Sequence, residues 1–210
     1  MMEETKFRTQ SIEGFLDALG STSHIPGGGA AAAQLGATAC ALAEKTARIT
    51  LSNKNYASVH EDAARWAEIF SQARDILLDL MDEDAKQFQI LMEAYKTFRK
   101  EGKTEAEIEE AMQDIYMKAA EAPSQIAGLL ADLSELFTEV LHKGNKNLLS
   151  DSIIASEFAI GAIHAAILNV RINAKSVHND FYQHEVEESI KSWEHAVSAI
   201  EAVLTYQVTL

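Results

Sequence analysis

The first stretch that could do chemistry is a glycine turn at 26–29. Three consecutive glycines, Gly27, Gly28 and Gly29, lack Cβ atoms, so another group can approach the backbone closely. The alanine run at 30–33 favours a helix directly after the turn. Because free N–H groups and the positive end of the helix dipole meet at a helix start, the turn predicts a site for a carboxylate or phosphate. The alternative is a tight turn that packs against a neighbouring helix.

A second candidate is the acidic triplet Asp82-Glu83-Asp84. It interrupts a long apolar periodicity, in which Asp84 lies between Met81 and Phe88 at helical spacing. A carboxylate at the edge of an apolar face has a raised pKa and is a candidate general acid or base. Asp82 is rotated away from that face, and we expect it to be exposed to solvent. The alternative for the whole triplet is a solvated cluster of charges.

Polar side chains also interrupt the apolar pattern of residues 147–178. Asp151, Asn169 and Asn173 are predicted to lie on a helix that is otherwise largely buried. Buried carboxyl and amide groups need hydrogen-bonding partners, which are either a ligand or the ends of neighbouring helices. At the standard helical rise, about 27 Å separates Asp151 from Asn169. The two therefore cannot touch one reacting carbon within one subunit, and a long ligand or a second subunit is needed to unite them.

Metal and nucleotide motifs are weak in this chain. A di-metal helical bundle needs two Glu-x-x-His motifs, and only one occurs, from Glu139 to His142. There is no Cys/His cluster, and no Lys-Ser/Thr pair follows the glycines as in a Walker loop. The single cysteine, Cys40, lies among alanines and is expected to be a small buried side chain. We therefore predict no metal site and no cofactor.

Composition narrows the class of protein. The chain has 210 residues and a net charge of −14, from 18 basic and 32 acidic residues, so we expect it not to bind nucleic acid. Neither a secretory signal nor a transmembrane stretch is indicated, and one cysteine fits a reducing compartment. We expect a cytoplasmic protein that does not bind membranes.

The apolar periodicity predicts helices throughout and no strands. The expected helices are 11–20, 30–50, 56–100, 104–120, 123–142, 147–178 and 183–207. Ser11 is a candidate N-cap, Thr104 and Glu107 form a capping-box pair, and Pro123 is placed at the first turn of a helix. The predicted fold is all-α: one domain, 1–210, forming a bundle with long central helices.

Taken in series, several short motifs resemble one family. They are Pro26-Gly27-Gly28-Gly29, the turn at 51–56, Asp82-x-Asp84-Ala85-x-x-Phe88, Ala122-Pro123, Gly144-Asn145-x-Asn147-x-x-Ser150-Asp151 and Asn169-Val170-x-Ile172-Asn173. The series resembles the cyclodeaminase domain of formiminotransferase-cyclodeaminase and its stand-alone relatives, including folate cyclohydrolases. Ala30 departs from the pattern, because Ser or Thr usually follows the three glycines.

The resemblance implies an all-helical homodimer that acts on a tetrahydrofolate derivative in one-carbon metabolism or histidine degradation. The implied reaction cyclises 5-formiminotetrahydrofolate to 5,10-methenyltetrahydrofolate and releases ammonia. Asp84 and Asp151 are the predicted catalytic residues. The predicted substrate contacts are Gly27, Gly28, Gly29, Arg48, Asp82, Asn145, Asn169 and Asn173.

Two alternatives stay open at this point. The first is a 5,10-methenyltetrahydrofolate cyclohydrolase, in which water is the nucleophile and the same carboxylate could serve. The second is a folate-binding or structural helical dimer that keeps the fold without catalysis.

Overall fold

A computed structural model describes residues 6–207, and these residues contain helices and no strands. The prediction of an all-helical fold is confirmed, whereas the homodimer stays a prediction. Residues 1–5 and 208–210 of the expected domain lie outside the described residues. The helices are η1 (Phe7–Thr9), α1 (Ile12–Leu19), α2 (Gly28–Ser52), η2 (Lys54–Val59), α3 (His60–Lys100), α4 (Glu105–Asp132), α5 (Ser134–Lys143), η3 (Lys146–Leu148), α6 (Leu149–Ala174) and α7 (Asp180–Gln207).

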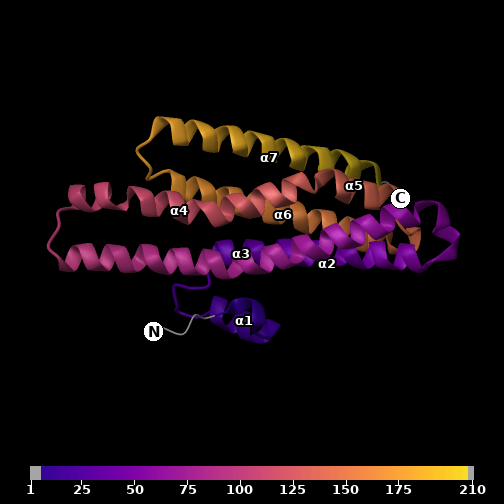
Figure 1. The fold of residues 1–210 in the computed structure, drawn as a ribbon, viewed down its shortest axis with the longest axis horizontal. Coiled ribbons are helices and arrows are strands. Elements are labelled where there is room, and N and C mark those ends of the chain that lie inside the picture. Colours follow the sequence, from indigo (N-terminus) through magenta and orange to yellow (C-terminus); the bar gives the residue numbers. More distant parts are fainter. Residues whose placement is uncertain (1–5, 208–210) are drawn as a thin grey trace.

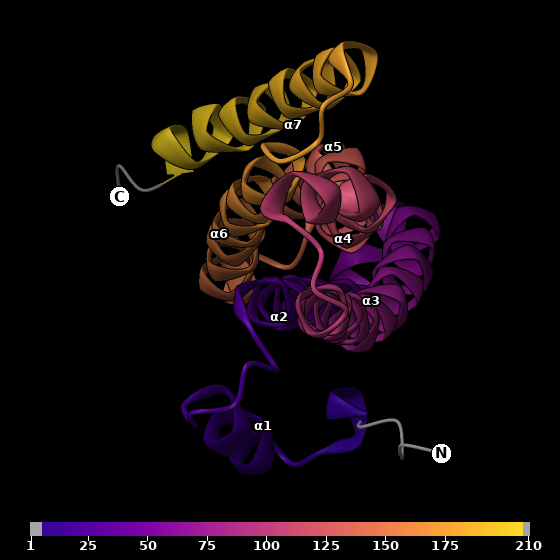
Figure 2. The ribbon, with the colours of Figure 1, turned by 90° about the vertical axis from the view of Figure 1, so that its left-hand side faces the viewer.

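Four long helices, α2, α3, α4 and α6, run side by side and form the body of the molecule (Figure 1). Seen end-on, α2 packs against α3 and α6, and α4 closes the ring against the same two helices (Figure 2). α7 lies along the outside of α4, α5 and α6, and α1 lies apart on the other side of the bundle.

Small residues let α2 approach its neighbours closely. Ala33, Ala37, Cys40 and Ala43 are buried on this helix, and they leave room for larger side chains from α3, α4 and α6. A Cβ at Gly36 would lie 2.9 Å from a methyl group of Leu130 in α4. The small-residue pattern therefore sets the helix spacing, because the core is filled by side chains from the partner helices.

Several local predictions are confirmed. The Ser11 side chain accepts a hydrogen bond from the Gly14 N–H at 3.0 Å. Thr104 and Glu107 form a complete capping box at the start of α4. Cys40 is fully buried, and this burial raises the pKa of its thiol to about 12, so it packs as a small apolar side chain.

Several helix boundaries differ from the prediction, including the start of α3, which is His60 rather than residue 56. Pro123 lies inside one continuous helix, α4, and the chain breaks ten residues later at Leu133. The buried ring of Pro123 is held by the contacts that α4 makes with α3 and α6, so packing overrides the intrinsic penalty of proline in a helix. The predicted helix 147–178 ends earlier, at Ala174, and a short loop leads to α7.

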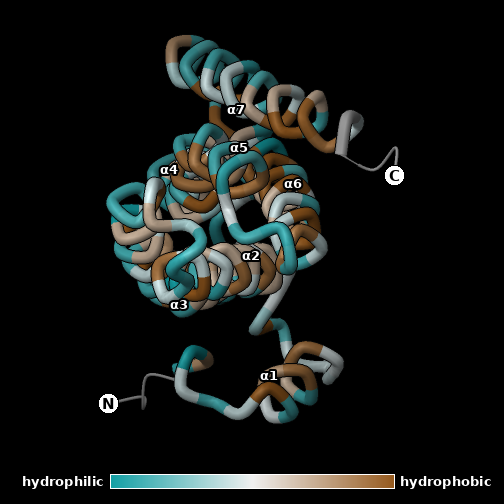
Figure 3. The backbone as a smooth tube through the Cα atoms, turned by 90° about the vertical axis from the view of Figure 1, so that its right-hand side faces the viewer, coloured by the Kyte–Doolittle hydropathy of each residue, from teal (hydrophilic) through white to brown (hydrophobic). Residues whose placement is uncertain are grey.

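Within residues 6–207, one segment, Lys146–Ala174, is long and apolar enough to span a membrane by length and composition. The sequence did not indicate such a segment. It consists of η3 and α6, and half of its apolar stretch is buried inside the bundle, where it contacts α2, α4, α5 and α7. Figure 3 shows α6 mainly in the brown of apolar residues. The same property is found in core helices of soluble proteins, which bury their apolar faces against neighbouring helices.

Candidate active site

The start of α2 forms the floor of a cavity of about 220 Å³. The walls come from α3, α4 and α6 and from the loop that precedes α2. The lining residues are His24, Gly27, Gly28, Gly29, Asp84, Ala85, Phe88, Ala119, Asn169, Ile172 and Asn173. Six residues that the sequence singled out therefore meet at one place, although they lie up to 146 positions apart in the chain.

Asp84 is the carboxylate of this cavity. It projects from α3 toward the first turn of α2, where the Ala30 N–H donates a hydrogen bond to it. Burial raises the pKa of the Asp84 carboxyl to about 6, and the Ala30 hydrogen bond partly opposes that rise. The carboxyl can thus exchange a proton near neutral pH, as a general acid or base requires.

Gly29 is the residue that makes room for this carboxyl group. A Cβ at position 29 would overlap both carboxylate oxygens and the carboxyl carbon of Asp84. The sequence predicted an anion at the glycine turn, and in the structure a carboxylate of the chain itself occupies that place. The positive end of the α2 dipole is therefore directed at Asp84, where it favours the ionised form.

Asn169 and Asn173 lie on α6 and close the side of the cavity opposite α3. The Asn169 amide lies against Gly28, and its Nδ2 donates to the Ala165 carbonyl at 2.8 Å. The Asn173 Nδ2 donates to the carbonyl of Ala119 in α4, also at 2.8 Å. Since both NH₂ groups are engaged with the backbone, Oδ1 of each amide is the atom suited to accept a hydrogen bond from a ligand.

Sequence reasoning missed several lining residues. His24 is exposed on the loop before the glycines, and Phe88 and Ile172 are 38% and 61% exposed at the mouth of the cavity. Phe88 and Ile172 belong to the motifs that carry the family resemblance, but the sequence assigns neither of them a role. Their one-turn spacing from Asp84 and Asn169 was the signal that could have placed them beside the site, since residues three or four apart share a helix face.

Asp82 is placed differently from the prediction. It is partly buried, and its Oδ1 accepts hydrogen bonds from the N–H groups of Phe7 and Arg8 at 2.6 and 3.2 Å. Phe7 is buried and packs edge-on against Phe15, so the N-terminal segment is fastened to α3 at this point. Asp82 does not line the cavity of Asp84, because residues two positions apart on an α-helix point about 200° apart around its axis.

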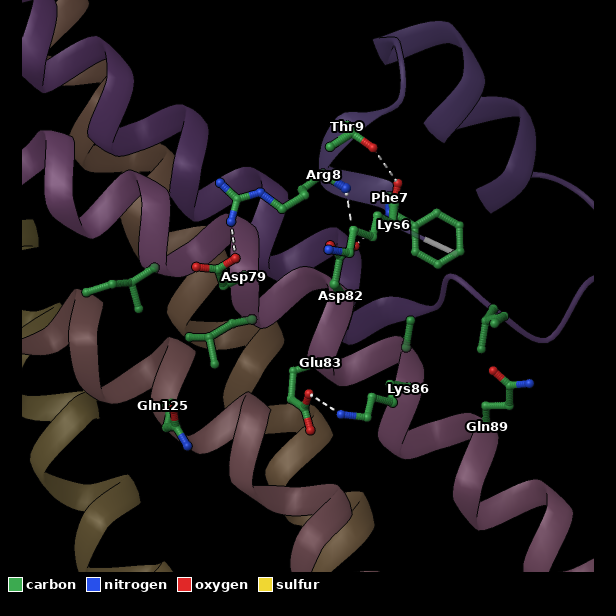
Figure 4. Close-up of a pocket in the computed structure, with 14 residues that line it drawn as sticks. Lys6, Phe7, Arg8, Thr9, Asp79, Asp82, Glu83, Lys86, Gln89 and Gln125 are labelled. Carbon is green, nitrogen blue, oxygen red and sulfur yellow. Dashed lines mark hydrogen bonds and ion pairs between the residues drawn. The ribbon is translucent and has the colours of Figure 1, made fainter. Parts of the chain in front are cut away.

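Figure 4 shows a larger cavity, about 620 Å³, between this N-terminal segment and α3. Four of its charged side chains are already paired within the chain. Arg8 pairs with Asp79, and Lys86 lies 3.2 Å from Glu83. Because the carboxylates of this larger cavity are already engaged by cations or backbone N–H groups, the smaller cavity around Asp84 is the better candidate for acid–base chemistry.

The remaining predicted residues lie toward the other end of the bundle. Asp151 pairs with Lys45 of α2 at 2.7 Å, and Arg48 pairs with the buried Glu44 at 2.6 Å. The Asn145 side-chain oxygen accepts a hydrogen bond from the Asn147 N–H, and the backbone N–H of Asn145 donates to the Thr50 hydroxyl at 2.9 Å. About 22 Å of α2 separates Lys45 from the first turn that holds Asp84. Within one chain, the structure does not bring these residues to the Asp84 cavity.

No group of three or more His, Cys, Asp or Glu side chains within residues 6–207 is arranged to hold a metal ion. The chemistry that this cavity offers is therefore that of one carboxyl group, two amide oxygens and the exposed imidazole of His24.

The family model described as "Formiminotransferase-cyclodeaminase" matches residues 11–192, which is most of the chain. The chain belongs to this family. The resemblance that the motifs carried is thereby confirmed. In fold, the chain matches the crystal structure of formiminotetrahydrofolate cyclodeaminase from Thermotoga maritima with a TM-score of 0.83 and 29% identity, over 95% of this chain and 98% of the other.

Two activities are represented among the family's named members. Methenyltetrahydrofolate cyclohydrolase of Methylorubrum extorquens is 30% identical over 185 residues, which are 88% of each chain. Formimidoyltransferase-cyclodeaminase of Mus musculus is 28% identical over 182 residues, and the chain spans 34% of its length. Both are enzymes, in agreement with the two enzyme activities that the sequence predicted, and the chain is a member of a family of folate one-carbon enzymes.

Proposed function

We propose that this protein cyclises 5-formiminotetrahydrofolate to 5,10-methenyltetrahydrofolate and releases ammonia. The observation that carries the proposal is Asp84, a carboxyl group with a pKa of about 6, in a cavity that two amides share. The similarity in fold to a cyclodeaminase over nearly the whole chain supports it. No metal or redox cofactor is needed for this reaction.

The reaction needs proton transfer at two nitrogens. N10 of the protonated, amidinium form of the substrate attacks the formimino carbon and loses a proton, and the resulting amino nitrogen gains a proton and leaves as ammonia, which gives the methenyl cation. We assign the first transfer to the Asp84 carboxylate, which is mostly ionised near neutral pH because its pKa is about 6. In its ionised form, Asp84 also stabilises the amidinium-like cation that develops between the two nitrogens.

The two amides would hold the reduced pterin. Their Oδ1 atoms can accept hydrogen bonds from ring N–H groups, because each Nδ2 already donates to a backbone carbonyl. Phe88 and Ile172, which are partly exposed at the mouth, offer apolar surface to the flat ring system. The aminobenzoyl-glutamate portion extends beyond a cavity of about 220 Å³.

A second candidate is hydrolysis of 5,10-methenyltetrahydrofolate. One observation favours it: the cyclohydrolase of Methylorubrum extorquens matches over 88% of both chains, so it has nearly the same length as this protein. In this reaction Asp84 would take a proton from the attacking water, and no change in the site is needed.

Absorbance separates the two activities, because methenyltetrahydrofolate has its own near-ultraviolet band. Purified protein is mixed with 5-formiminotetrahydrofolate, and the growth of that band and the released ammonia are followed. In a second assay, loss of the band from added methenyltetrahydrofolate is compared with a blank. A rate equal to the blank in both assays would contradict both proposals.

Asp84→Asn tests the assignment of the carboxyl group. We expect kcat to fall by about 10²–10⁴-fold, the contribution that a general acid or base makes. Glu83→Gln is the matched control, since Glu83 is the neighbouring residue of α3, pairs with Lys86 and lies outside the cavity. Equal rates for the two variants would show that the Asp84 carboxyl takes no part in the reaction.

A further inference from the structure

Pro123 removes one hydrogen bond from α4 at the level of the cavity. A proline has no N–H, so the carbonyl four residues earlier in the helix has no donor from its own helix. That carbonyl belongs to Ala119, which is buried and lines the cavity. Pro123 itself is buried and does not line the cavity.

The carbonyl that Pro123 leaves free is used by a residue of the site. Asn173 Nδ2, from α6, donates to the Ala119 carbonyl at 2.8 Å. A buried carbonyl needs a donor, and a partly buried amide needs an acceptor, so this one contact satisfies both groups. It also decides which way the amide is turned, because Nδ2 is held at α4 and Oδ1 remains for a ligand.

Asn169, the other amide of the cavity, is oriented without help from a second helix. Its Nδ2 donates to the carbonyl of Ala165, which lies four residues earlier in its own helix, so no second element is needed to orient it. Asn173 instead depends on a carbonyl of another helix. With any residue other than proline at position 123, that carbonyl would accept a hydrogen bond from the backbone N–H of residue 123.

From this geometry we propose that Pro123 is a positioning residue, which acts through the Ala119 carbonyl to orient the Asn173 amide toward bound folate. The inference rests on the proposed function for the identity of the ligand. Pro123 lies within a long helix, where proline opposes helix formation. In return, it leaves a hydrogen-bond acceptor in a fixed position at the site.

Pro123→Ala tests this inference, because it separates stability from binding. Alanine supplies the missing N–H and is a much better helix former, so the melting temperature should rise. The restored N–H competes with Asn173 for the Ala119 carbonyl, so KM for the folate substrate should rise by about tenfold, the effect of losing one hydrogen bond. A substitution that merely disturbed the fold would instead lower the melting temperature while it raised KM.

The matched control is Ser124→Ala, which alters the adjacent residue of α4. The Ser124 hydroxyl donates to the Ala120 carbonyl at 2.7 Å and makes no contact with Asn173. A double-mutant cycle completes the test. In an Asn173→Ala background, Pro123→Ala should leave KM unchanged, because the residue through which it acts is gone.

A readout without turnover keeps this inference apart from the proposed function. The Asn173 side-chain NH₂ signals in the ¹⁵N NMR spectrum, assigned by their loss in Asn173→Asp, should shift in Pro123→Ala and stay in place in Ser124→Ala. Unshifted signals, a lower melting temperature or the same tenfold effect in the Asn173→Ala background would each overturn the role of Pro123. If the wild type turns over neither folate while the signals shift, the positioning role stands and the proposed function fails.

Discussion

At the scale of single residues, the site depends on how closely Gly29 and Asp84 approach. The glycine turn was recognisable from the sequence as a place for an anion. The identity of the anion was not recognisable, since Gly29 and Asp84 are 55 positions apart and lie on different helices. Only the packing of α3 against α2 shows that the turn receives a carboxyl group of the protein.

Gly29→Ala should therefore inactivate the enzyme without unfolding it. The new Cβ would overlap the Asp84 carboxyl group and force it away from the Ala30 N–H. We expect an activity loss of about 10²-fold, as for a misplaced catalytic group, with an unchanged far-ultraviolet circular dichroism spectrum.

The control for Gly29→Ala is Gly128→Ala, where the added Cβ would make an ordinary 3.6 Å contact with the indole nitrogen of Trp193. Full activity in Gly29→Ala would show that the approach of the two residues is not needed for catalysis.

The pH dependence of the rate should follow Asp84. Its pKa is raised from the ordinary value of a carboxyl group to about 6, so the carboxylate that acts as base is lost as pH falls below about 6. We expect kcat to rise about tenfold per pH unit below that value and to level off above it. Rate measurements between pH 4.5 and 8.5 in constant ionic strength test this, and a flat profile would contradict it.

The contribution of Asp84 to the stability of the fold should fall as pH rises, whereas its contribution to the rate should increase. Because the pKa is higher in the folded state than in the unfolded state, the contribution of Asp84 to stability is complete at low pH and is lost as pH rises through about 6. Asp84→Asn should consequently have an equal or higher melting temperature than the wild type at pH 8. A lower melting temperature at that pH would indicate that burial of the charged carboxylate carries no penalty.

At the scale of elements, α3 carries two neighbouring carboxylates with separate tasks. Asp84 faces the cavity, and Asp82 fastens the N-terminal segment through the N–H groups of Phe7 and Arg8. Helical spacing correctly separated the two faces of α3. It could not show that the face of Asp82 is covered, because the segment that covers it lies 74 positions away.

Asp82→Ala should loosen the N-terminal segment and leave the cavity intact. Two backbone N–H groups would lose their acceptor, so the free energy of unfolding should fall by about 1–3 kcal/mol. Hydrogen exchange should be faster at residues 7–15 than in the wild type.

The matched variant is Asp79→Ala, which removes an exposed partner of Arg8 and should change the unfolding free energy by less than about 1 kcal/mol. The proposed role of Asp82 is wrong if the two variants have equal stability.

At the scale of the whole molecule, the outer face of α6 carries apolar residues at alternating spacings of four and three. They are Ile154, Phe158, Gly161, Ala165, Leu168 and Ile172, and none of them is fully buried in one chain. This spacing is typical of a helix that packs along a second helix. It supports the predicted homodimer and offers a reason, other than a membrane, for the apolar character of this helix.

The dimer is tested by light scattering coupled to size-exclusion chromatography. We expect the wild type to have the mass of two chains, and the double variant Ile154→Asp and Leu168→Asp to have that of one. These two side chains are 42% and 59% exposed in one chain, so the substitutions should not disturb its core. A monomeric wild type would rule out the homodimer.

A dimer also allows a test of Asp151, which lies far from Asp84 within one chain. If Asp151 completes the site of a partner subunit, Asp84→Asn and Asp151→Asn are each inactive alone. After mixing and exchange of subunits, about a quarter of wild-type activity should return, because half the dimers then hold one intact site of two. If no activity returns in a mixture whose subunits are shown to exchange, each active site is formed by the residues of one chain.

Local patterns of residues were enough to predict the helical fold, most helix ends to within a few residues and the chemical types at the site, because helix periodicity, caps and glycine turns depend on neighbouring residues. The contacts between distant residues became visible only in the folded chain. Asp84, rather than a ligand, lies at the glycine turn, and Asp82 lies beneath the N-terminal segment. Asn173 donates to the carbonyl that Pro123 leaves free. These contacts join residues 50 or more positions apart, and their energy comes from burial in the packed bundle, which no local pattern encodes.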